Sequence, residues 1–142
     1  MNDDRRKKID LLIEDFWKRG YRIVSRKHGT YLPEPSRVGA FDIDIIARYK
    51  KSYAIGIVLN NNDIMSDSLM EKIKFLADRK TKYSNKKVPL FIGVSDENFK
   101  TVKTLVSILN GDIKKNIKVI AISEKNLQPS AADNVFQTAI FS

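Results

Sequence analysis

The stretch that decides the fold is Phe-Asp42-Ile-Asp44-Ile-Ile-Ala-Arg-Tyr-Lys-Lys-Ser-Tyr-Ala-Ile-Gly-Ile-Val-Leu-Asn, which occupies positions 41–60. Two runs rich in β-branched residues flank the polar segment 50–52, a pattern that predicts a β-hairpin. In the first run, a side-chain period of two places Asp42 and Asp44 on one face. Such carboxylates are costly to bury unless a divalent cation, a basic partner or solvent compensates their charge. The second run carries no charged side chain at all.

The composition is that of a globular chain of one domain, predicted to span residues 1–142. Its length suffices for a single core, and 42% hydrophobic and 30% charged residues fit the globular class. The absence of cysteine excludes disulfides, thiolate zinc sites and cysteine nucleophiles, and it favours a cytoplasmic location. No apolar run approaches the roughly 20 residues of a membrane helix, so no membrane partner is expected.

The charge balance points to a polyanionic partner. The chain has 26 Lys and Arg against 17 Asp and Glu, a net charge of +9. Counterion release makes such an excess favourable for binding nucleic acid, most simply DNA. A lysine-rich solvated surface is the alternative interpretation. The residues predicted to contact DNA are Arg5, Arg6, Lys7, Lys8, Arg26, Lys27, Lys50, Lys51, Lys80 and Lys82.

Helical and strand patterns alternate along the rest of the chain. Helices are expected over residues 4–19, 68–81 and 96–109, and strands over 21–26, 89–94 and 117–122. Ser68 and Glu71 have the spacing of a capping box at the start of the second helix. Strands that alternate with helices predict parallel pairing, and therefore an α/β fold with a mixed central sheet flanked by helices.

The segment 127–142 is apolar and nearly uncharged, unlike the rest of this basic chain. Such a segment is expected to cover a sheet edge or to join a second subunit. A homodimer or a protein partner therefore stays open, and so does the hypothesis of a dimeric interaction or scaffold protein.

The hairpin and the order of the elements resemble the PD-(D/E)xK nuclease superfamily, and within it the archaeal Holliday junction resolvase branch. The resemblance covers residues 5–122, and its specific part is Val-Gly-Ala-Phe-Asp42-Ile-Asp44-Ile-Ile-Ala, a turn, and Tyr-Ala-Ile-Gly-Ile-Val58. It implies a restriction-endonuclease-like αβββαβ core. It also implies a site in which an Asp, and a Glu-x-Lys on the next strand, bind Mg²⁺ and activate a water molecule.

The second strand departs from the family pattern. Matching Asp44 to the family aspartate puts Gly56 at the glutamate position and Val58 at the lysine position. A shift of one residue offers only Ile57 and Leu59. The predicted function is therefore a nuclease-fold protein that has lost catalysis, needs no cofactor, and binds DNA non-specifically or acts as a partner subunit.

A rearranged active site is the alternative. It makes the chain a magnesium-dependent endodeoxyribonuclease, resembling a Holliday junction resolvase, with Asp42, Asp44 and Glu34 as catalytic residues. Asp44 and Asp42 are then weak metal ligands, and Lys72 or Lys74 supplies the missing amine. Further carboxylates that would complete such a site are Asp10 and Glu14.

A purely structural interpretation of the two aspartates also stays open. In it, Asp42 and Asp44 form ion pairs with arginines on neighbouring strands and have no chemical role. The candidate partners are Arg22, Arg26 and Arg48.

Overall fold

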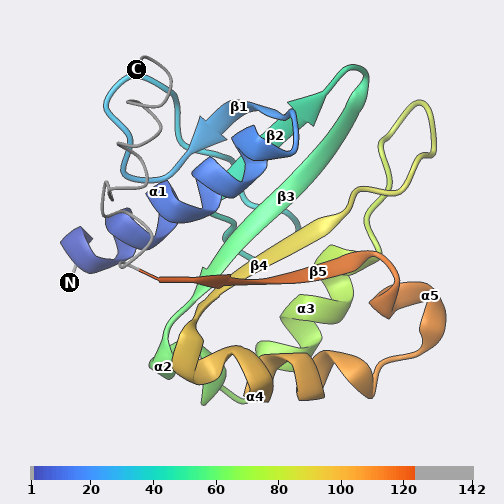
Figure 1. Cartoon of the computed structure of the whole chain (residues 1–142). Helices are drawn as coiled ribbons and strands as arrows, with labels where there is room; N and C mark the ends of the chain where they lie inside the picture. The colour runs from blue at the N-terminus through green and yellow to red at the C-terminus, as the bar shows by residue number, and fades with distance from the viewer. Residues whose placement is uncertain (1, 124–142) are drawn as a thin grey trace, which may run out of the picture.

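A five-stranded mixed sheet in the order β1-β2-β3-β4-β5 forms the centre of the computed structural model, which describes residues 2–123 (Figure 1). The strands β1, β2 and β3 pair antiparallel, whereas β3, β4 and β5 pair parallel. The strands are β1 (Arg22–Arg26), β2 (Ile45–Tyr49), β3 (Ser52–Leu59), β4 (Leu90–Ser95) and β5 (Ile117–Ile122). This arrangement confirms the predicted α/β class, the mixed sheet and the parallel pairing in the second half.

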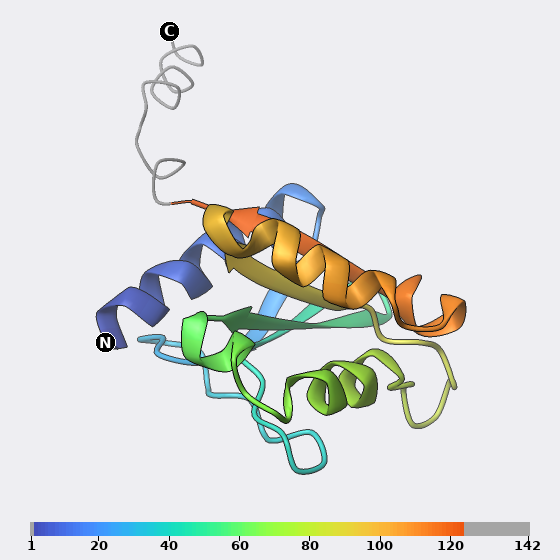
Figure 2. The same cartoon turned by 90° about the horizontal axis from the view of Figure 1, so that it is seen from below.

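Helices cover both faces of the sheet (Figures 1 and 2). The long helix α1 packs on one face, and α3 and α4 pack on the other. Two single-turn helices, α2 and α5, lie in the connections. The helices are α1 (Asn2–Lys18), α2 (Asn61–Ile64), α3 (Leu69–Ala77), α4 (Asp96–Ser107) and α5 (Gly111–Lys114). No helix among the described residues has the length and apolar content needed to cross a bilayer.

Helix α1 buries a stripe of large apolar side chains against the sheet. Ile9, Leu12 and Phe16 recur at helical spacing, and none of them exposes any surface. The Phe16 ring lies so close to β3 that a Cβ atom added to Gly56 would stand 2.9 Å from it. Gly56 is thus required by packing, because any larger residue at this position would overlap the core under α1.

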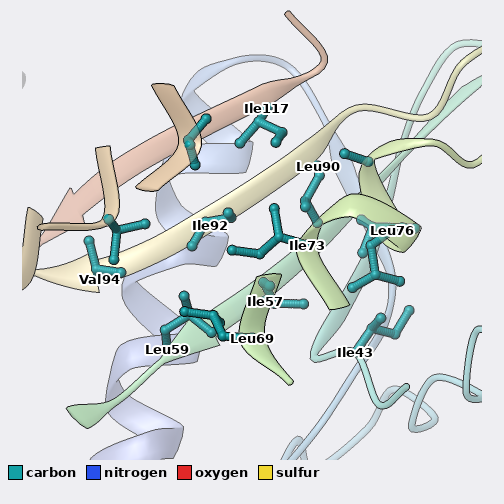
Figure 3. Packing of buried hydrophobic residues seen from close by; sticks show 14 of the residues in the cluster. Ile43, Ile57, Leu59, Leu69, Ile73, Leu76, Leu90, Ile92, Val94 and Ile117 are labelled. Carbon is teal, nitrogen blue, oxygen red and sulfur yellow. The ribbon is translucent and has the colours of Figure 1, made fainter. Parts of the chain in front are cut away.

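The opposite face of the sheet carries the larger core, in which α3 and α4 pack on β3, β4 and β5 (Figure 3). Alternate residues of β3 divide between the two cores. Ile57 and Leu59 belong to this one, and Val58 belongs to the core under α1. The uncharged second run of the hairpin is therefore buried on both sides, as a central strand of a covered sheet must be.

The first run of the hairpin differs from the prediction. Strand β2 begins only at Ile45, so Asp42 and Asp44 precede it. The backbone N–H of Asp44 still donates to the carbonyl of Gly56 (3.0 Å), whereas the segment before it forms an isolated bridge between Val38 and Phe41. The period of two does not extend into this irregular segment. The two carboxylates are therefore not equivalent positions of one regular strand, and the Asp42 side chain is 55% exposed whereas that of Asp44 is only 3% exposed.

The predicted capping box is also in the wrong place. Ser68 makes no side-chain cap, and the box forms at α2, where the Asn60 side chain accepts from the Asp63 N–H (2.8 Å). The Asp63 carboxylate in turn accepts from the Asn60 N–H (2.9 Å). The polar run 60–63 therefore supplies the N-cap and most of the single-turn helix α2. The tail 127–142 lies outside the described residues.

Candidate functional site

The candidate site is built around Asp44, at the end of β3 that follows Val58. Its carboxylate is one of two buried polar side chains among the described residues, the other being that of Ser25. Oδ2 of Asp44 accepts a hydrogen bond from the backbone N–H of Val58 (2.8 Å). At the position where the family pattern has lysine, the chain thus supplies a backbone donor, while the Val58 side chain packs under α1.

Arg5 of α1 neutralises Asp44. Its Nη2 atom lies 3.2 Å from Oδ2 of Asp44 and also donates to the carbonyl oxygen of Val58 (2.9 Å). Its Nη1 atom lies 3.3 Å from Oδ2 of Asp63. Burial opposes the charge on Arg5, but attraction to the two carboxylates and hydrogen bonds with them outweigh this effect, and the pKa of Arg5 is raised. One guanidinium therefore joins carboxylates from two elements that are distant in the sequence.

Lys72 of α3 adds a second cation to this cluster. The Lys72 side chain is partly buried and interacts electrostatically with Asp44, Asp63 and Arg5. Burial lowers the pKa of Lys72; Asp44 and Asp63 oppose this shift, and Arg5 adds to it. Lys74, the other lysine considered from the sequence, is exposed on α3.

Asp42 belongs to a separate and more exposed pair. Its Oδ1 atom accepts from Nε of Arg37 (3.1 Å), and its Oδ2 atom lies 3.7 Å from Nζ of Lys27. The hydrogen bond from Arg37 and the charge of Lys27 lower the pKa of Asp42. Both aspartates thus form ion pairs with basic side chains, as one part of the structural interpretation expected. The partners are nevertheless not the expected Arg22, Arg26 and Arg48.

A cavity of about 230 Å³ lies beside these residues. Asp42 and Arg37 line it from the loop before β2, Asp63 lines it from α2, and Lys72 lines it from α3. Two aspartates and two cations therefore face the same space. Ser66 and Ser68, whose hydroxyl groups are 3.0 Å apart, complete its polar wall.

The arrangement does not fit the magnesium site that the resemblance implies. Mg²⁺ needs oxygen ligands in near-octahedral geometry, and here the Arg5 guanidinium bonds to both Asp44 and Asp63. Within residues 2–123, no group of three or more His, Asp or Glu side chains is placed to hold a metal ion. Glu34 is exposed in the loop between β1 and β2 and does not line the cavity. The predicted cluster of Asp42, Asp44 and Glu34 is thus not brought together.

The residues predicted to contact DNA do not form one continuous surface. Four of them are engaged in ion pairs with aspartates: Arg5, Lys8, Arg26 and Lys27. Arg6 and Lys7 are exposed on α1, whose beginning lies at the opposite end of the molecule from the turn that carries Lys50 and Lys51 (Figure 1). Lys80 and Lys82 lie in the connection between α3 and β4.

Two members of the site were missed as site residues in the sequence. Asp63 lies in the polar run 60–63, and the reciprocal spacing of Asn60 and Asp63 is the signal that would have placed it at a helix start. Arg37 carries no sequence signal of its own. Comparison of the chain with protein-family models, with curated proteins and with solved structures found no match to any of them.

Proposed function

We propose that this chain is a nuclease-like domain that has lost metal-dependent catalysis and binds DNA through the phosphate backbone. The loss of catalysis rests on one observation above all, which is the pairing of Arg5 with Asp44. A cation supplied by the protein itself neutralises the carboxylate that a catalytic metal would need.

The fold supports the first part of this proposal. The order α1, β1, β2, β3, α3 and β4, with the single-turn helix α2 before α3, is compatible with the αβββαβ order that the resemblance implies. The family glutamate position is occupied by Gly56, where the Phe16 ring leaves no room for a side chain. A carboxylate cannot be recovered there by a single substitution without disturbing the core.

The charge supports the second part. The aspartates of the site are paired with basic side chains of the protein. The excess positive charge of the chain, +9 in total, is therefore carried by lysines and arginines outside the site. Such contacts to phosphates hold DNA without reading its sequence. Binding should therefore be strongly salt-dependent and nearly independent of base composition.

Fluorescence anisotropy with labelled duplex and four-way junction DNA, at increasing salt, tests this proposal. We expect log K to fall linearly with log salt, and each lost phosphate contact to reduce the slope by about 0.9. Lys7→Glu and Lys51→Glu probe the two ends of the molecule, and Lys100→Glu on α4 is the charge-matched control. Absence of binding at low salt, or an equal effect of all three variants, contradicts the proposal.

One observation favours a second candidate, a nuclease with a rearranged site. Lys72 is partly buried near Asp44, where it would take the place of the family lysine. Incubation of the protein with linear and branched DNA and Mg²⁺ or Mn²⁺ distinguishes the two candidates. Cleavage that Asp44→Asn and Lys72→Met both abolish would replace the first candidate by the second.

A further inference from the structure

A second hollow, of about 390 Å³, lies along the outer edge of β5. Its lining includes no residue of the site around Asp44. Strand β5 is the last strand of the sheet, and within the described part of the chain no other strand pairs with its outer edge (Figure 1). Side chains from both faces of β5 line the hollow, namely Val119 from the α4 side and Ile120 from the α1 side. The hollow thus runs along the edge itself.

Four cations from four different elements surround this hollow, and its lining contains no acidic side chain. They are Arg19 just after α1, Lys103 of α4, Lys114 of α5 and Lys118 of β5. This differs from the cavity lined by Asp42 and Asp63, where two cations balance the two aspartates. Arg19 is paired with Asp15, whereas the three lysines form no ion pair with an acidic side chain among the described residues. Their like charges repel one another, so the site gains most from a ligand that brings negative charge.

Two of these cations are held in place by the protein. Nζ of Lys114 donates to the carbonyl oxygen of Ser107 (3.3 Å), which uses one of its three donors. Nε of Arg19 donates to Asp15 (2.6 Å), and the guanidinium lies 5.4 Å from the centre of the Phe91 ring. Arg19 has five donors, so this pair leaves the Nη groups as further donors beside the hollow.

Apart from Ser107, the remaining lining is apolar. Val106 of α4, with Ile117, Val119 and Ile120 of β5, forms it. The volume of the hollow lies within the range of sites for small ligands. The apolar side chains offer contacts to an organic group, and the cations suit an anionic group attached to it.

We propose that the hollow along β5 binds a nucleotide through its phosphate group, with the base over the apolar lining. Two ligands carry such a phosphate group: a free mononucleotide, and the 5′-phosphorylated end of a nucleic acid strand. This inference goes beyond the proposed function, because it concerns other residues and requires neither duplex binding nor loss of catalysis.

NMR titration of the ¹⁵N-labelled protein at low salt tests the proposal with AMP, adenosine and inorganic phosphate. We expect saturable shifts with AMP around residues 117–120, weaker shifts with phosphate, and none with adenosine. Lys118→Glu and Lys103→Glu should each weaken AMP binding about fivefold or more. Lys74→Glu, an exposed lysine on α3, is the charge-matched control and should leave the affinity unchanged.

A second arm separates the two sources of phosphate. An oligothymidylate with a 5′-phosphate should perturb residues 117–120 more strongly than the same strand with a 5′-hydroxyl if strand ends are the ligand. If the two strands act alike while AMP binds, the free nucleotide is the ligand. The proposal is overturned if AMP gives no saturable shifts, if adenosine binds as well as AMP, or if folded Lys118→Glu and Lys103→Glu bind AMP like the control.

Discussion

Replacing Arg5 by methionine tests the site most directly, because it removes the guanidinium and keeps a long apolar stem. In the substituted protein, Asp44 stays buried with only the Val58 N–H as a hydrogen-bond partner. Removing one partner of a buried ion pair costs about 3–5 kcal/mol. The Arg5 side chain is 26% exposed and Lys72 lies nearby, so we expect the lower end, about 3 kcal/mol.

Urea denaturation followed by circular dichroism measures this loss in the free energy of unfolding. With a slope of about 2 kcal/mol/M, the midpoint should fall by about 1.5 M urea. Arg6→Met is the matched control, because Arg6 is exposed and makes one long hydrogen bond to Thr30 (3.4 Å). This control should change the stability by no more than about 0.5 kcal/mol.

A double-mutant cycle with Asp44→Asn isolates the interaction. Asparagine keeps an acceptor for the Val58 N–H and removes the charge, so Arg5→Met should cost less in its presence. We expect a coupling energy of about 2 kcal/mol, within the range for residues in contact. If Arg5→Met is as mild as Arg6→Met, or if the two substitutions are additive, the argument that Arg5 neutralises Asp44 is refuted.

Three further predictions concern neighbouring groups. Gly56→Ala should destabilise the fold by about 1–3 kcal/mol in urea denaturation, since the added Cβ meets the Phe16 ring; a neutral effect would contradict this packing. Burial lowers the pKa of Lys72, so between its folded-state pKa and 10.5 its contribution to stability rises with pH. An NMR titration of ¹³C-dimethylated lysines measures this pKa, and the signal of Lys72 is assigned as the one that is absent in the Lys72→Arg variant. As the pH is raised, the Lys72 signal should titrate before those of the other lysines. Arg37→Ala should raise the pKa of Asp42 in a carboxyl NMR titration; the wild-type pair contributes its stability above pH 3.8 and loses it as the pH falls through the folded-state pKa of Asp42.

The elements were predictable where the hydrophobic period extends over a whole helix or strand. Strand β5 was predicted with the residues observed, and α1, β3 and β4 to within about two residues at either end. The first strand of the hairpin was predicted too long, because an aspartate two positions from another looks the same in a strand and in the irregular segment that precedes it. The single-turn helices α2 and α5 are too short to carry a period.

The candidate site was predictable only in part. Asp44 was identified from its place beside an apolar run, and Lys72 was considered as a substitute amine. The partner of Asp44 was not found, since Arg5 is 39 positions away in the sequence and was assigned to a DNA-binding surface. The cations along β5 were missed for the same reason, because they come from four elements and form no run in the sequence.

The sequence alone determined the α/β class, the mixed sheet and the aliphatic character of β3, because local periodicity records which side chains must be buried. Only the tertiary structure decided the surroundings of the charged groups. It separated Asp42 from Asp44, brought the guanidinium of Arg5 to Asp44 and Asp63, and gathered cations along the edge of β5. The physical reason is that ion pairs depend on distances of a few ångströms between elements remote in the chain, and no local pattern encodes those distances.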